Sequence, residues 1–175
     1  RQDGRLNDTM SLIDPIRLPA QGAATVDSVA DGYEAFALAA IAEGFGERPL
    51  VFVARDGQRL PAIAETLAFA APGLPVLELP AWDCLPYDRV SPGSDAAARR
   101  LDALAAMAAL REKPHRAVVL ISANALLQRI PPADAIAAQT IVAKPGNQID
   151  MNVMAARLDT AGFERVPTVR DVGEF

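Results

Sequence analysis

The stretch from Val29 to Ala35 is where this chain could bind a nucleotide, because it precedes a predicted helix in a predicted α/β sheet. A phosphate loop needs glycines for close approach of its backbone and a lysine for the β- and γ-phosphates. The stretch offers one glycine, Gly32, between the acids Asp31 and Glu34, and no Gly-Lys-Ser or Gly-Lys-Thr triplet occurs in the chain. Because these acids would repel a triphosphate, the sequence favours a plain helix start over a nucleotide site.

Other catalytic chemistries have little to build on. A Ser-His-Asp or Cys-His site would have to use His115, the only histidine, which lies in a polar link before a predicted strand. Cys84 is the only cysteine, so neither an intrachain disulfide nor a typical zinc site is expected. Asp83 and Asp88 form a carboxylate pair within one loop, and a small stand-alone α/β enzyme that uses such a pair remains an alternative.

The segment from Leu79 to Pro92 contains the only tryptophan, Trp82, and one of the two tyrosines, Tyr87. Its prolines restrict the course of the backbone. Large aromatic side chains in a stiff loop usually anchor packing against a neighbouring element, so we expect this loop to seal the domain or a seam between domains. The alternative is a loop that binds a partner or stacks on nucleic-acid bases, for which Arg89 is the only basic neighbour.

Alternating helices and strands with short links account for most of the chain. Helices are predicted where apolar residues recur at helical spacing, and strands where short apolar runs lie between turn signals. The predicted helices span 28–43, 60–70, 94–111 and 122–129, and the predicted strands span 50–54, 76–79 and 117–121. This order implies an α/β fold with an open parallel sheet covered by helices on both faces.

The predicted helices have recognisable ends and faces. Gly44 and Gly46 end the first helix, and Leu101, Leu104 and Ala108 share one face of the long helix. Serine and aspartate side chains accept hydrogen bonds from the first free N–H groups of a helix. The predicted N-caps are Ser28 or Asp31, Ser94 or Asp95, Ser122, and Asp150.

A second, smaller unit follows a break at Pro131-Pro132. A strand at 139–143, a turn at 145–147 and a strand at 163–169 are predicted around one helix. That helix begins at Asp150, ends at Gly162, and carries on one face Met151, Met154, Leu158 and Ala161. We therefore expect a flexible leader (1–11), an α/β subdomain (12–127) and a small, incomplete α+β subdomain (128–175).

The composition narrows the function classes. The net charge is −5 and the only lysines are Lys113 and Lys144, so no basic face for duplex DNA is visible. No apolar run reaches the roughly 18 residues of a membrane span, and residues 1–11 lack a signal-peptide core. A single cysteine suits a reducing compartment. We expect a cytoplasmic protein with no membrane contact and no bound cofactor.

The aromatic loop also carries a family resemblance. Its pattern resembles a signature in the N-terminal region of bacterial transcription-repair coupling factors, through Leu79, Pro80, Trp82, Asp83, Leu85, Pro86, Tyr87, Asp88, Ser91 and Pro92. Three further stretches resemble the family in the same order, namely 123–129, 158–163 and 172–175. The resemblance covers about residues 12 to 175.

The resemblance implies a fold similar to the excision-repair protein UvrB, with a degenerate helicase-like first subdomain and then a subdomain that interacts with UvrA. Glu34 falls near the position of the phosphate-loop lysine, and Ser91-Pro92-Gly93 leaves no room for the DNA-threading hairpin of UvrB. Binding of ATP, DNA and RNA polymerase would then belong to missing domains of a DNA translocase. This segment itself would be non-catalytic.

The resemblance also implies the binding roles. The segment would help recruit UvrA in nucleotide excision repair, and it would pack on the rest of its own chain to restrain the whole protein. The candidate partner-binding residues are Arg157, Arg165, Arg170, Glu174 and Phe175, although a solvated helix face and strand margin explain the arginines equally well. Because the matching UvrA contacts lie just past Phe175, we expect weak binding. The alternative from another class is a UvrB-type helicase fragment that binds ATP or DNA.

Overall fold

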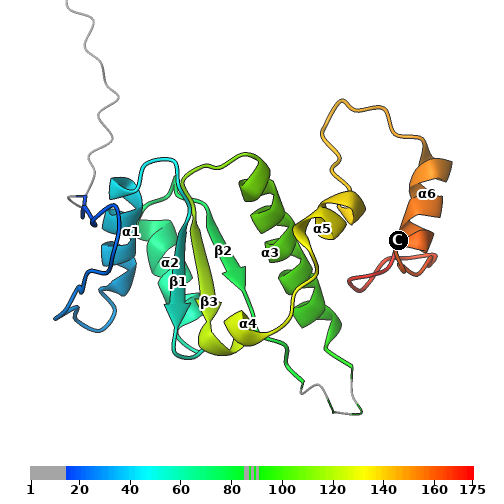
Figure 1. The fold of residues 1–175 in the computed structure, drawn as a ribbon. Helices are drawn as coiled ribbons and strands as arrows, with labels where there is room; N and C mark the ends of the chain where they lie inside the picture. The colour runs from blue at the N-terminus through cyan, green and yellow to red at the C-terminus, as the bar shows by residue number, and fades with distance from the viewer. Residues whose placement is uncertain (1–14, 85–86, 88, 90) are drawn as a thin grey trace, which may run out of the picture.

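The computed structural model describes residues 15–84, 87, 89 and 91–175. Helices and strands alternate as far as α4, and the last two elements are helices (Figure 1). In chain order the elements are α1 (Glu34–Gly44), β1 (Leu50–Ala54), α2 (Leu60–Ala70), β2 (Val76–Leu79), α3 (Ser94–Glu112), β3 (Val118–Ser122), α4 (Ala123–Leu127), α5 (Ala133–Gln139) and α6 (Met151–Thr160). The predicted strands at 50–54, 76–79 and 117–121 and the predicted helix at 60–70 are confirmed.

The three strands form one open parallel sheet in the order β1-β3-β2. Val118 in β3 lies in register with Leu50 of β1 and Val76 of β2. All five residues of β3 are buried, as expected for a central parallel strand that is covered on both faces. The predicted α/β class with an open parallel sheet is therefore confirmed.

Helices lie on both sides of this sheet, with α3 on the opposite side from α1 and α2 (Figure 1). One face packs on α1 and α2 through a core that includes Leu38, Ile63, Leu67 and Leu120. Ile121 points to the other face and packs with side chains of β2, α3 and α4, and with Ile136 of α5, through the cluster Leu79, Ala103, Leu104 and Ala125.

The prediction that both faces of the sheet are covered is wrong at β1. Val51 and Val53 are 53% and 43% exposed, whereas Leu50 and Phe52 on the other face pack against the α1–α2 core. The elements on the α3 side pack over β2 and β3 and leave β1 bare. Half-buried β1 therefore resembles a strand of a one-sided sheet more than a fully enclosed one.

The first helix begins later than predicted. Ser28 has a φ of 56°, outside the helical range, and α1 starts at Glu34 after Tyr33 with no side-chain N-cap. Asp31, the other predicted cap, instead lies 3.4 Å from Arg59 of the α1–α2 side of the fold. Both predicted caps are therefore wrong, and a turn closed by the hydrogen bond from the Tyr33 N–H to the Ala30 carbonyl precedes α1.

The long helix α3 differs in two details. Its N-cap position is Gly93, so the predicted caps Ser94 and Asp95 lie inside the first turn, where Asp95 pairs with Arg99 at 2.8 Å. Leu101 is 52% exposed and does not share the buried face of Leu104 and Ala108. The buried stripe instead runs through a charged residue at position 100, which periodicity of apolar residues does not find.

The two remaining predicted N-caps are confirmed. The Ser122 hydroxyl accepts the Ala125 N–H at 3.1 Å and begins α4, which ends at Leu127. The Asp150 carboxylate accepts the Asn152 and Val153 N–H groups at 2.9 and 3.2 Å. These contacts satisfy N–H groups that have no partner within their own helix.

The region after α4 is thinner than expected. The predicted strand at 139–143 is wrong, because α5 extends to Gln139 and residues 140–144 form no strand. The predicted strand at 163–169 is reduced to one parallel bridge between Glu164 and Glu174. No residue from 126 to 175 is buried, so this part has no core of its own.

Among the described residues, no helix has the length and apolar character to cross a bilayer.

The described residues before α1, from 15 to 33, are called the leading segment below. Gly44, at the predicted end of α1, meets this segment closely: a Cβ there would lie 2.4 Å from the backbone oxygen of Ile16. The Ile16 N–H in turn donates to the Ala40 carbonyl at 2.9 Å, which fixes this segment on α1.

We predict that Gly44→Ala destabilises the chain by about 1–3 kcal/mol, because the added methyl forces the backbone at Ile16 away from α1. Chemical denaturation of both proteins measures this difference. Gly57→Ala is the matched control, since nothing lies within 4 Å of a Cβ at Gly57. Equal stability of the two variants would contradict the close approach of Ile16.

Candidate functional site

The loop before α1, for which the sequence predicts a degenerate phosphate loop, is occupied by one of its own side chains. The Glu34 carboxylate accepts the Gly32 N–H at 2.9 Å and forms an ion pair with Arg59, at the start of α2. The Arg59 guanidinium also lies 3.4 Å from the Asp31 carboxylate. The backbone N–H and the cation that could hold a phosphate are therefore engaged with carboxylates.

The hollow beside this loop is small. It has a volume of about 240 Å³ and is lined by Gly32, Glu34, Arg59, Ile63 and Thr66, among others. The Glu34 side chain is 22% exposed, so the carboxylate is partly enclosed there. Two carboxylates beside one guanidinium leave a net negative charge, which opposes binding of a nucleoside triphosphate.

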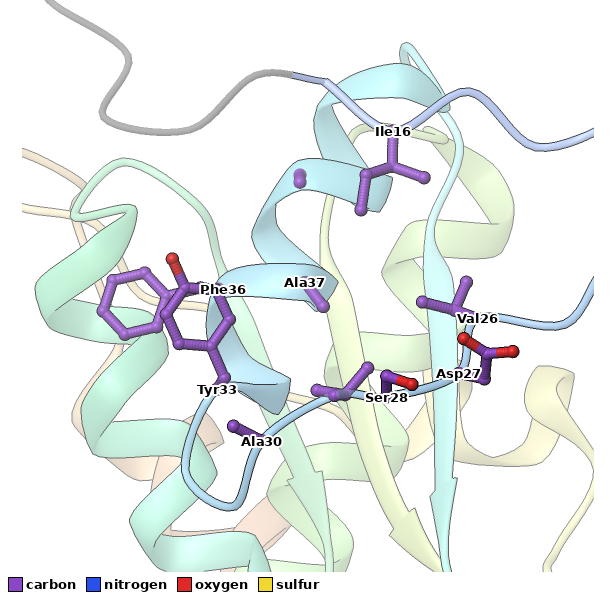
Figure 2. A pocket seen from close by; sticks show the side chains of 10 residues that line it. Ile16, Val26, Asp27, Ser28, Ala30, Tyr33, Phe36 and Ala37 are labelled. Atoms are coloured by element: carbon purple, nitrogen blue, oxygen red, sulfur yellow. The ribbon is translucent and has the colours of Figure 1, made fainter.

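A larger groove lies between the leading segment and α1 (Figure 2). Its volume is about 410 Å³, and Ile16, Val26, Phe36 and Ala37 contribute to its mainly apolar lining. The Tyr33 and Phe36 rings stack with centroids 5.0 Å apart. An apolar groove without an acid–base pair suits packing of apolar groups rather than catalysis. Sequence reasoning missed it because residues 28–33 were predicted to be helical and the contact of Ile16 with α1 is distant in sequence.

A third hollow lies at the carboxyl ends of the strands, where parallel α/β sheets usually bind ligands. It has a volume of about 520 Å³ and mixes acids with cations, among them Glu78, Asp102, Arg55 and Arg99. Asp83 does not line it. The stand-alone enzyme alternative would gain support from a deep pocket that joins Asp83 or Asp88 to other polar groups; this hollow does not include Asp83, and Asp88 lies outside the described residues.

The other candidate catalytic groups lie apart from one another. The Asp83 carboxylate accepts the Gly93 N–H at 3.2 Å, and exposed His115 has its Nδ1 atom 3.1 Å from the Lys113 carbonyl oxygen. Cys84 is a half-buried free thiol. In residues 15–84, 87, 89 and 91–175, no group of three or more acids, histidines or cysteines has the geometry of a metal site.

The aromatic signature is anchored at its first half. Trp82 is half-buried, and its backbone N–H donates to the Gln128 side-chain oxygen at 3.0 Å. The Arg100 guanidinium lies 4.9 Å from the centre of the Trp82 indole ring. Tyr87 is 97% exposed, and Ser91 and Pro92 are also exposed. Leu85, Pro86 and Asp88 lie outside the described residues. Among the described members, the sealing role thus fits Trp82 and not Tyr87.

Arg100 is the partner of the signature that sequence reasoning missed. It is 1% exposed, and its guanidinium donates to the Pro80 carbonyl. Burial lowers the pKa of the Arg100 guanidinium, which nevertheless stays protonated at neutral pH. A cationic side chain within the buried stripe of α3 could have been noticed as an exception to the apolar pattern.

The candidate partner-binding residues divide into two groups. Arg157, Arg165 and Arg170 are exposed, and the Arg157 guanidinium makes one long contact of 3.4 Å with the Ala138 carbonyl. Glu174 and Phe175, by contrast, hold the local backbone: the Phe175 N–H donates to Glu164 at 2.9 Å, and its carbonyl accepts the Val166 N–H at 2.9 Å.

Glu174 orders a turn. Its carboxylate accepts the Arg170 N–H at 2.7 Å and the Asp171 N–H at 3.1 Å. These two backbone hydrogen bonds, to Arg170 first and then to Asp171, lower the pKa of Glu174. The carboxylate is therefore already engaged within the chain, and the turn depends on its charge.

Comparison with known proteins places the chain. No family model matches it. It is 35% identical to the transcription-repair-coupling factor of Myxococcus xanthus over 133 residues, which are 73% of this chain and 11% of that protein. It is 28% identical to the factor of Escherichia coli over 127 residues and 32% identical to that of Mycobacterium tuberculosis over 130 residues. The chain is a relative of the transcription-repair coupling factors.

The resemblance predicted from the aromatic signature is thus confirmed. Each of these matches covers 73% of the chain, so it extends well beyond the signature. The chain spans only about a tenth of the length of the coupling factors it matches. It corresponds to one part of such a factor.

We predict that the turn held by Glu174 is intact above the ordinary pKa of a glutamate and is lost as the pH falls through its lowered pKa in the folded chain. An NMR titration that follows the Arg170 and Asp171 amide shifts together with the Glu174 carboxyl carbon measures this. Glu174→Gln should remove the pH dependence from both amides. A titration midpoint equal to that of a free glutamate would contradict the lowered pKa.

Proposed function

We propose that the chain is the N-terminal, non-catalytic module of a transcription-repair coupling factor, where it contributes to UvrA recruitment and to restraint of its own protein. The observation that carries this proposal is the Glu34 carboxylate, which occupies the loop where a helicase-like domain would hold a phosphate. The lack of a core in residues 126–175 adds to it, since such a segment needs a partner surface to bury its apolar side chains.

The non-catalytic role is supported by where the polar groups lie. Glu34 forms an ion pair with Arg59, at the start of α2. His115 and Asp83 each contact nearby backbone rather than one another. A catalytic site would need an acid, a base or a nucleophile within hydrogen-bond reach of its partner. The proposal therefore assigns ATP, DNA and RNA polymerase to other domains of the coupling factor, and no cofactor to this module.

The UvrA role is supported by the charges of the second unit. Arg157, Arg165 and Arg170 are exposed and form no ion pair within the described part of the chain. All three lie in the segment that follows the α/β sheet. Exposed arginines next to apolar side chains such as Val169 and Val172 suit a protein interface with an acidic partner surface.

We predict that this chain binds purified UvrA weakly, with a dissociation constant in the range of about 1–100 µM. Combined reversal of Arg157, Arg165 and Arg170 to glutamate should weaken binding at least about tenfold, because the charges of the interface would then repel. Arg116→Glu, in the exposed link before β3, is the control for a charge reversal outside the second unit. Calorimetric titration measures all three proteins.

Two results would overturn this role. If UvrA does not bind, the module is a restraining piece of its own protein and not a recruiter. If the triple variant and the Arg116 control bind as the wild type does, the interface lies outside the second unit. Circular dichroism of each variant separates a lost interface from a lost fold.

The alternative, a UvrB-type fragment that binds ATP or single-stranded DNA, makes a different prediction. We expect no saturable binding of ATP with magnesium below about 1 mM, and no salt-sensitive DNA binding in a filter assay. A micromolar constant for ATP, or DNA affinity that falls steeply with salt, would favour the helicase alternative. These measurements are independent of UvrA, so the two proposals can fail separately.

A further inference from the structure

Arg100 is a buried cation without a matching anion. It is 1% exposed and forms no ion pair within the described part of the chain. Its Nη2 atom is buried and has no hydrogen-bond partner among the residues that the structure describes. A buried charge without a paired anion costs free energy, and a buried N–H group without an acceptor adds to that cost. The packing of α3 therefore includes an interaction that is not fully satisfied.

What Arg100 does contact is a short stretch of the loop that follows β2. Its Nη1 atom donates to the Pro80 carbonyl, and its guanidinium faces the Trp82 ring at 4.9 Å. A cation over an indole is attracted by the charge distribution of the ring, and the attraction strengthens when both are removed from water. Arg100 thus fastens residues 80–82 to α3.

Two further contacts fasten the same stretch. The Trp82 N–H donates to the side chain of Gln128, the first residue after α4. The Asp83 carboxylate accepts the Gly93 N–H and closes the neck of the loop, so closely that a Cβ at Gly93 would lie 2.9 Å from its oxygen. We call residues 80–84 the strap, because these contacts fasten this stretch to α3, to Gly93 just before α3, and to Gln128 just after α4.

We propose that the strap opens and closes as a unit, with the stack of Trp82 on Arg100 holding it closed and solvation of the Arg100 guanidinium favouring the open form. In the closed form Nη2 has no acceptor, and in the open form water supplies one. The attraction to Trp82 and the hydrogen bond to Pro80 offset this gain. These opposed contributions reduce the free-energy gap between the closed and the open form.

The strap has a consequence beyond the docking function proposed above. The backbone N–H of Trp82 donates a hydrogen bond to the side chain of Gln128, and Gln128 begins the link between the α/β sheet and residues 129–175. Opening would break this hydrogen bond and the Asp83–Gly93 contact together. The strap therefore couples Gly93, just before α3, to Gln128, just after α4, whichever partner the second unit binds.

Hydrogen exchange tests the strap directly. We expect the Trp82 and Gly93 amides to exchange at similar free energies that barely depend on low concentrations of denaturant, because local opening exposes little surface. The Leu120 amide, in the buried central strand, should exchange only through global unfolding. If Trp82 and Leu120 exchange with the same free energy and the same denaturant dependence, the strap does not open by itself and the proposal fails.

Substitution at position 100 gives the second test. Arg100→Lys keeps the charge but loses the planar stack, and should speed exchange at Trp82 about tenfold, or about 1.4 kcal/mol. Exchange at Leu120 should speed by a similar factor, because global unfolding breaks the same stack, while the two amides keep their different free energies and denaturant dependences. Arg99→Lys is the matched control, because Arg99 is exposed and pairs with Asp95 instead. Emission from Trp82, the only tryptophan, should change in the first variant and not in the second.

The remaining outcomes count against the proposal. Acceleration at Leu120 without acceleration at Trp82 would mean that Arg100 stabilises the core and not the closed strap, and no acceleration at either amide would mean that the stack does not hold the strap. Should Arg100→Lys fail to fold, Trp82→Leu removes the stack from the other side. That variant should speed exchange of the Gly93 and Leu120 amides by similar factors, and exchange of the Gly93 amide should keep its weak denaturant dependence.

Discussion

The fold depends on the burial of β3 between two helical layers. Its five residues are inaccessible to water on both faces, and its backbone pairs on both edges with parallel strands. Every other described element is arranged around this strand or attached after it. Val118 and Leu120 point to α1 and α2, whereas Val119 and Ile121 point to the other face. A polar residue in β3 would therefore disturb one of the two layers directly.

The alternation of short apolar runs with helical periodicity was sufficient to predict the α/β class and the open parallel sheet, but not the strand order or the exposed face of β1. The strands and α2 were predicted because their boundaries are marked by proline, glycine and a change of period. The start of α1 was not predicted, because Ser28 and Asp31 are good caps in isolation but Asp31 is drawn to Arg59, a residue distant in sequence. The strand at 139–143 failed because no neighbouring strand exists to pair with it.

The candidate site was predictable in part. The absence of a phosphate loop followed from residue types alone, whereas the pairing of Glu34 with Arg59 required the packing of α2 on α1. Sequence patterns identified Trp82 because it is the only tryptophan and lies in a loop with several prolines, but they did not identify its partner, Arg100. Arg100 escaped because a pattern of apolar residues treats a buried arginine as an error, although its long stem and planar head suit an aromatic neighbour.

The two charged groups Glu34 and Arg100 illustrate different ways of using charge in a small fold. Glu34 remains partly solvated and is compensated by Arg59 and a backbone N–H, so its interactions fix one arrangement. Arg100 is enclosed without compensation, so its interactions oppose each other. A satisfied charge stabilises a single structure, and an unsatisfied one lowers the cost of leaving it. The signature loop is attached to the second kind of charge, which is why its attachment can be reversible in an otherwise well-packed sheet.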